Sequence, residues 1–103
     1  MLNRILKQYI FRDINCKSSE CPVFLAVLWN QHNTKNLISN LNEFVEKLTL
    51  EDDEILFIKN RKDTGNYVAH INNDFIIIDE QFHVFPMNSR IFGYLFTELK
   101  NAD

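Results

Sequence analysis

The apolar residues of the first half of the chain recur every three or four positions. In residues 33–50 they are Leu37, Ile38, Leu41, Phe44, Val45 and Leu48. This spacing is typical of an amphipathic helix, and Asn33 or Thr34 can cap its N-terminus. Residues 2–13 show the same spacing and are also predicted to be helical. An acidic run, residues 51–54, ends the second helix.

Residues 22–29 form a short apolar run that periodicity alone does not assign. Pro22 suits the first turn of a helix, where a missing N–H costs nothing. The same run also fits a strand that is buried on both faces. We favour the helix and keep the strand as the alternative.

The pattern changes to strands after residue 54. Residues 55–58 are apolar and precede a polar loop over residues 59–65. Residues 67–71 and 75–78 flank Asn-Asn-Asp, so they are predicted to pair as a hairpin. Because residues 75–78 contain no polar residue, we place this strand inside a sheet, covered on both faces.

The last elements are a strand over residues 82–85, stopped by Pro86, and a helix that begins near Asn88 or Ser89. The helix is expected to present its apolar residues on one side: Ile91, Phe92, Leu95 and Leu99. The predicted fold is therefore α+β, with N-terminal helices, an antiparallel β-meander of three to four strands and a C-terminal helix. Residues 1–103 form a single compact domain in this interpretation.

Composition narrows the classes of function. The net charge of −3 argues against nucleic acid as a partner, because phosphate binding needs a cationic surface. The two glycines, Gly65 and Gly93, lie far apart, which excludes glycine-rich phosphate loops. No run of about 18 apolar residues is present, so no membrane-spanning helix is expected. No cofactor or metal site is predicted either.

The N-terminus and the cysteines bear on the compartment. Residues 1–13 lack the continuous apolar run of a signal peptide, so a cytoplasmic location is expected. In a reducing cytosol Cys16 and Cys21 are expected to be free thiols. Nine Phe residues are more than one small core needs, which is compatible with a homodimer.

One set of residues has the composition of a hydrolytic site, namely Cys21, His70 and Asp79. Cys21 would open the helix of residues 22–29, where the helix dipole favours a thiolate. In the predicted hairpin, His70 and Asp79 point to the same face, so the acid can orient the imidazole.

This chain order over residues 15–86 resembles that of papain-like cysteine hydrolases and deamidases, including compact bacterial toxin domains. The resemblance implies Cys21 as nucleophile, His70 as general base and Asp79 as orienting acid. The sequence departs from that family after the cysteine, where Pro22 stands, and before it, where Asn15 is the only amide nearby.

The leading interpretation is non-enzymatic. A short acidic chain with little catalytic apparatus is typical of immunity proteins, antitoxins and small inhibitors, which occlude the active site of a protein partner. The partner would carry a basic surface, because electrostatic steering speeds association of opposite charges. The candidate contacts are the carboxylates Glu43, Glu46, Glu51, Asp52, Asp53 and Glu54.

Overall fold

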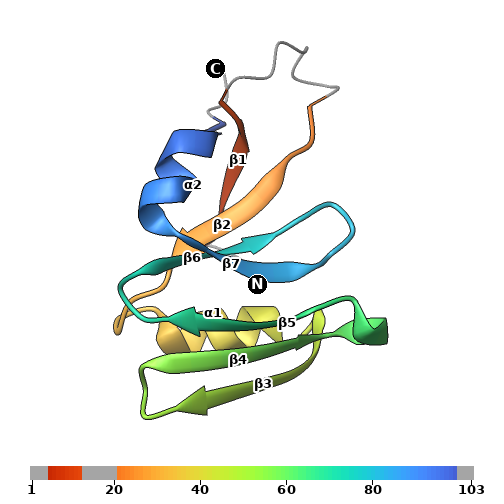
Figure 1. Ribbon diagram of the computed structural model, residues 1–103, viewed down its shortest axis with the longest axis vertical. Helices are drawn as coiled ribbons and strands as arrows, with labels where there is room; N and C mark the ends of the chain where they lie inside the picture. The colour runs from red at the N-terminus through yellow and green to blue at the C-terminus, as the bar shows by residue number, and fades with distance from the viewer. Residues whose placement is uncertain (1–4, 13–20, 100–103) are drawn as a thin grey trace.

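The computed structural model describes residues 5–12 and 21–99. In these ranges the chain forms eight strands, two α-helices and one 3-10 turn (Figure 1). In chain order they are β1 (Lys7–Phe11), β2 (Phe24–Leu28), α1 (Thr34–Leu41), β3 (Val45–Glu51), β4 (Ile55–Asn60), η1 (Arg61–Asp63), β5 (Asn66–His70), β6 (Asp74–Ile78), β7 (Val84–Asn88), α2 (Ser89–Leu95) and β8 (Phe96–Glu98).

The strands make two antiparallel sheets. The larger sheet has the order β7-β6-β2-β1-β8, and the smaller has the order β3-β4-β5. The predicted fold class is wrong, because the described part of the chain is mostly β and has no N-terminal helix. The structure does contain a three-stranded meander, but it is β3-β4-β5: its first strand was predicted to be helical, and the predicted strands over 75–78 and 82–85 belong to the larger sheet instead.

The larger sheet is covered on both faces. Ile76 and Ile78 of β6 point to a core shared with α1 and the three-stranded sheet. Ile77, between them, points to a second core closed by Phe92 of α2. Side chains alternate along a strand, so a strand buried on both faces must be apolar throughout. The expectation that residues 75–78 lie inside a sheet is confirmed.

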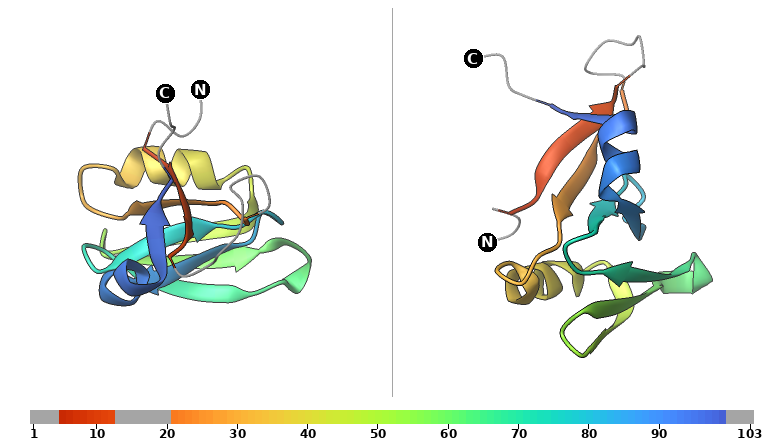
Figure 2. Two further views of the ribbon diagram at one scale, coloured as in Figure 1. Left: turned by 90° about the horizontal axis from the view of Figure 1, so that it is seen from above. Right: turned by 60° about the vertical axis from the view of Figure 1, so that its left-hand side comes forward.

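The three-stranded sheet is covered on one face only. Leu56, Ile58 and Ala69 point inward and are buried against α1 and the larger sheet. In the right-hand view of Figure 2 these elements lie on one side of the three-stranded sheet. None of the described elements covers its other face, which we call the outer face.

Three helix predictions from the first half of the chain need correction. Residues 7–11 are β1, because they pair with β2 on one side and β8 on the other. Residues 24–28 are β2, so the strand alternative for the run 22–29 was correct. The helix predicted over 33–50 begins as expected at Thr34 but ends at Leu41, and the chain then forms β3.

The predicted hairpin between residues 67–71 and 75–78 is also wrong. Both segments are strands, but β5 pairs with β4 while β6 pairs with β2 and β7. The chain between them crosses from one sheet to the other, and two of its backbone N–H groups donate to carbonyls of other segments. The Asn72 N–H donates to the Trp29 carbonyl, at 2.8 Å, and the Ile71 N–H donates to the Glu54 carbonyl, at 3.0 Å.

Two other elements begin where the sequence predicts, but the C-terminal helix ends at Leu95, before β8, and of its expected apolar side Phe92 is buried while Ile91 and Leu95 are exposed. The strand over 55–58 is β4, and α2 begins at Ser89 with the Asn88 side chain accepting from the Arg90 N–H. Pro86 lies within β7 rather than ending a strand before it. It is tolerated because β7 is at the edge of the sheet, where one row of N–H groups has no partner strand.

Two further expectations concern chemistry and location. Cys21 is disulfide-bonded, so the expectation of a free thiol at this position is wrong. Cys16 lies outside the described residues. No helix within residues 5–12 and 21–99 is long and apolar enough to cross a membrane.

Candidate functional site

The proposed catalytic residues are not brought together. His70 is the last residue of β5, and its backbone N–H donates to Oδ2 of Asp74, the first residue of β6, at 2.7 Å. Asp79 follows the other end of β6, and a strand of five residues is about 13 Å long. The chain next to Cys21 lies at the Asp79 end, because the Val23 N–H donates to Glu80 Oε2. The disulfide at Cys21 also leaves no thiolate there to act as a nucleophile.

Each of the two histidines beside β6 has its own aspartate. His70 Nδ1 lies 3.6 Å from Asp74 Oδ2, and His83 Nδ1 lies 3.0 Å from Asp79 Oδ2. Both aspartates also accept the backbone N–H of their histidine. The predicted partner of His70, Asp79, therefore belongs to His83, and both aspartates hold the chain where it enters or leaves β6.

The six predicted contact carboxylates fall into two groups. Glu51, Asp52, Asp53 and Glu54 form the turn between β3 and β4. Glu43 and Glu46 were expected on a helix but lie between α1 and β3 and at the start of β3. Glu46 is 3.2 Å from Lys59 Nζ. The two groups are separated by the length of β3, so they cannot act as one patch.

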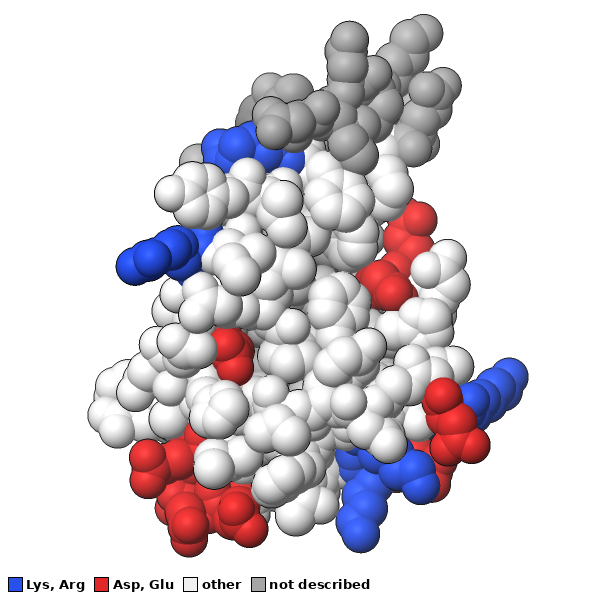
Figure 3. All heavy atoms as spheres, in the orientation of Figure 1, with Lys and Arg blue, Asp and Glu red and all other residues white. Residues whose placement is uncertain are grey.

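The turn of residues 51–54, here called the acidic turn, carries charge that its surroundings leave unpaired. No basic residue in the described part of the chain makes an ion pair with any of its four carboxylates. Figure 3 shows acidic atoms with no basic ones beside them at the corner where the β3–β4 turn lies in Figure 1. Four like charges on consecutive residues repel one another, which makes this corner a centre of negative potential.

The backbone of the acidic turn is strained. Asp52 and Asp53 have φ angles of 52° and 58°, in the left-handed region that glycine and asparagine adopt most cheaply. The Glu54 N–H donates to the Glu51 carbonyl, at 3.0 Å, which closes a two-residue hairpin. Aspartate is common at the first of these positions, but glycine fits the second better than Asp53 does.

The outer face of the three-stranded sheet joins the acidic turn to an apolar centre. Strand register places three rows of side chains on it. The row next to the turn is Glu51, Ile55 and His70; the middle row is Thr49, Phe57 and Val68; the far row is Lys47, Lys59 and Asn66. Phe57 is 39% exposed and Val68 44%, so the centre of the face is apolar and open.

A shallow hollow of about 290 Å³ lies over the middle and far rows of this face. Its lining combines the apolar centre with the two lysines Lys47 and Lys59. An apolar centre with a charged rim is the general anatomy of a protein-binding surface. Sequence reasoning found the acidic turn but missed Phe57 and Val68. The alternation along residues 55–59 indicates an outward Phe57, but only strand register shows that Val68 lies beside it.

A second hollow, of about 430 Å³, lies at the other end of β3 and β4, and we call it the loop pocket. Three segments form its walls: the α1–β3 connection, the loop after β4 and the β6–β7 turn. Its lining residues are Glu43, Phe44, Arg61, Lys62, Thr64, Gln81, Phe82 and His83. None of them except Glu43 was singled out as a contact from the sequence.

Among the described residues, no three His, Cys, Asp or Glu side chains gather as metal ligands. On β1, the pKa of Tyr9 is raised by burial and further by the charge of Glu98. Compared with known proteins, the chain matches no family model, no curated protein and no solved structure.

Proposed function

We propose that this chain is a binding protein that inhibits a protein partner by covering the partner's active site. The outer face of the three-stranded sheet and the acidic turn form the contact surface. The observation that carries the proposal is the acidic turn, where four unpaired carboxylates sit beside an open apolar face. Such a surface fits a partner with a cationic site surrounded by apolar residues.

The strain in the acidic turn supports a binding role. Asp52 and Asp53 both adopt left-handed backbone, which costs aspartate less than most residues but more than glycine. Neighbouring like charges add to this cost. Residues that bind a partner are commonly kept at the expense of stability.

The binding is expected to be electrostatic at long range and apolar at contact. Charge on the acidic turn would speed association, which would fall as salt is added. Phe57 and Val68 would supply the buried centre, since hot-spot contacts lie in the middle of an interface. Glu43 lies outside this surface, and Glu46 reaches only its far edge, where it pairs with Lys59.

The test uses two baits of equal net charge in affinity capture from the source cell. The first neutralises the acidic turn with Glu51→Gln, Asp52→Asn, Asp53→Gly and Glu54→Gln. The second removes four charges elsewhere, with Glu43→Gln, Asp63→Asn, Glu80→Gln and Glu98→Gln. The proposal predicts a stoichiometric partner on the wild-type and second baits and its loss from the first. Equal capture by both variant baits contradicts the proposal, and so does a captured enzyme that stays active in the 1:1 complex.

We further propose that this binding takes place in the cytoplasm. The disulfide at Cys21 argues against this location, because disulfides persist in oxidising compartments and are rare in the cytosol, so the redox state of Cys21 in the cell is the test. Alkylation of free thiols before and after reduction, on protein taken from its own cell, gives the redox state of Cys21. Reduced Cys21 agrees with a cytoplasmic location, and oxidised Cys21 contradicts it.

A further inference from the structure

The buried side-chain amide of Asn60 connects the loop after β4, which is one wall of the loop pocket, to the start of β7. Asn60, at the end of β4, is 1% exposed. Its Oδ1 accepts the Val84 N–H and its Nδ2 donates to the Val84 carbonyl, both at 2.8 Å. The same Nδ2 donates to the Gly65 carbonyl, at 3.1 Å. One side chain therefore ties the loop after β4 to the start of β7.

The opposite wall, the β6–β7 turn, is held by Asp79. Its Oδ1 accepts the backbone N–H groups of Gln81 and His83, both at 2.9 Å. Its Oδ2 lies 3.0 Å from His83 Nδ1, which orients the imidazole and leaves Nε2 as the ring nitrogen for another partner. The turn presents Gln81, Phe82 and His83 to the pocket in a fixed arrangement.

Both walls carry left-handed backbone at residues with long side chains. Lys62 has a φ of 56° and Phe82 a φ of 66°. Phe82 is nevertheless 59% exposed, so burial of its ring does not explain why this residue stands at this position. Strained backbone that displays a side chain at the rim of a hollow is a feature of binding sites.

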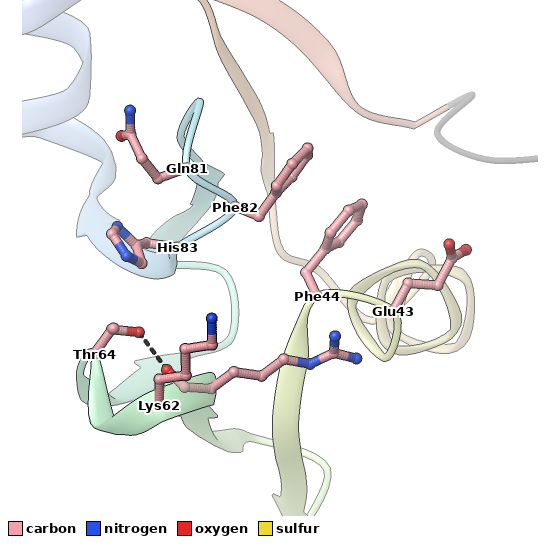
Figure 4. Close-up of a pocket in the computed structure, with 8 residues that line it drawn as sticks. Glu43, Phe44, Lys62, Thr64, Gln81, Phe82 and His83 are labelled. Carbon is pink, nitrogen blue, oxygen red and sulfur yellow. Dashed lines mark hydrogen bonds between the residues drawn. The ribbon is translucent and has the colours of Figure 1, made fainter.

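The lining combines cations with aromatic rings. Figure 4 shows the Lys62 amine pointing into the space bounded by Phe44, Phe82 and His83. Arg61 Nε donates to the Val45 carbonyl, and its terminal amino groups bond to no residue that the structure describes. The Glu43 carboxylate lies on the far side of Phe44 from Lys62 in Figure 4, so it does not neutralise that amine.

The two rings form a platform. Phe44 and Phe82 are parallel within 7°, with centroids 5.4 Å apart. This spacing is too small for another ring to enter between them, so a bound ring would lie on an outer surface of the pair. The volume of about 430 Å³ is within the range of sites for small organic ligands.

We propose that the loop pocket binds a small organic anion that carries a planar ring. Lys62 holds the anionic group by a charge-assisted hydrogen bond, the neighbouring charge of Arg61 adds attraction, and the ring lies against Phe82 and Phe44. The Gln81 amide and His83 Nε2 supply hydrogen bonds to polar atoms of the ring. This site is separate from the outer face, so it stands or falls independently of the proposed inhibitor function.

The experiment is a titration of the ¹⁵N-labelled protein, followed by amide chemical shifts, with four probes. Adenosine monophosphate and phenyl phosphate each join a ring to an anion, inorganic phosphate has the anion alone, and adenosine has the ring alone. The proposal predicts that at least one ring-bearing anion binds with the largest shifts at Lys62, Thr64, Gln81 and His83, and about tenfold more tightly than phosphate or adenosine. The two ring-bearing probes distinguish a nucleotide from a simpler aryl phosphate. Absence of shifts at these amides up to about 5 mM of every probe overturns the proposal, as does equal binding of phosphate alone.

Two variants that are expected to fold test the proposed ligand contacts of Lys62 and Phe82. Lys62→Gly and Phe82→Gly place glycine where φ is positive, and the relief of backbone strain offsets part of the lost side-chain contacts, so both are expected to fold. Each should weaken binding about tenfold. Asp63→Gly is the control, because Asp63 has a φ of 54° in the same loop but does not line the pocket. Equal losses in Asp63→Gly and Lys62→Gly would contradict the assignment.

Discussion

The two sheets differ in how many of their faces are covered. The larger sheet lies between the three-stranded sheet and α2, and its β6 strand is apolar at successive positions because both faces are cores. In β4 the inward Leu56 and Ile58 alternate with the outward Phe57 and Lys59. In the larger sheet, packing dictates the side chains. On the outer face no core does so, and the exposed Phe57 is a contact residue only under the proposed function.

The largest effect expected from this difference is on stability. Ile77→Ala removes a fully buried side chain from the larger sheet and should lower the free energy of unfolding by about 3 kcal/mol. Val68→Ala, on the outer face, should cost less than about 0.5 kcal/mol, as exposed substitutions usually do. Urea unfolding followed by circular dichroism gives both values. Similar losses for the two variants would show that the outer face is packed after all.

The link between the two sheets should give the next largest effect. Asn60→Ala leaves the N–H and carbonyl of Val84 without their side-chain partner in a buried site. Each unsatisfied buried group costs about 1–3 kcal/mol, so we expect a loss of about 2 kcal/mol after partial relaxation. Asn66→Ala, an exposed asparagine six residues on, is the matched control and should be near neutral. A loss below about 0.5 kcal/mol for Asn60→Ala would mean that water replaces the amide without cost.

The smallest expected effect is the change in stability with pH that Tyr9, on the α2 side of the larger sheet, contributes. The pKa of Tyr9 is raised by burial and by Glu98, so the folded state keeps this proton more tightly than the unfolded chain does. The resulting stability is fully present below the unfolded tyrosine pKa of about 10 and is lost as pH rises through the folded value. Urea midpoints at pH 8 and at about pH 11 should therefore differ less in Tyr9→Phe than in wild type. An equal difference in the two proteins would contradict the shift.

The sequence predicted short apolar strands and helix starts correctly, because these depend on residues that are close together in the chain. The apolar runs at 55–58 and 75–78 are strands, and α1 and α2 begin where predicted, although only Asn88, before α2, makes a side-chain capping hydrogen bond. Residues 7–11 and 24–28 were assigned to helices because their partners are distant in sequence. Tyr9 is opposite Glu98 and Lys7 is opposite Ala26, and no local period reveals such pairings.

Residues 42–51 show why one stretch can mislead. Leu41, Phe44, Val45 and Leu48 fit a helix, whereas Leu48 and Leu50 alternate with Lys47, Thr49 and Glu51 as in a strand. Residues 45–51 form a strand because they pair with β4. The candidate site follows the same logic. The acidic run was visible in the sequence, but separating it from Glu43 and Glu46, and joining it to Phe57 and Val68, required the register of β3, β4 and β5.

The central claim is that the outer face and the acidic turn are kept for binding and not for folding. Asp52→Asn with Asp53→Gly tests it most directly, because this pair is the preferred sequence for a turn with two positive φ angles. The account predicts that the melting temperature rises by several degrees, about 1 kcal/mol of stability, while affinity for the captured partner falls about tenfold. A double variant that is less stable than wild type, or one that binds the partner as tightly as wild type does, would contradict the account.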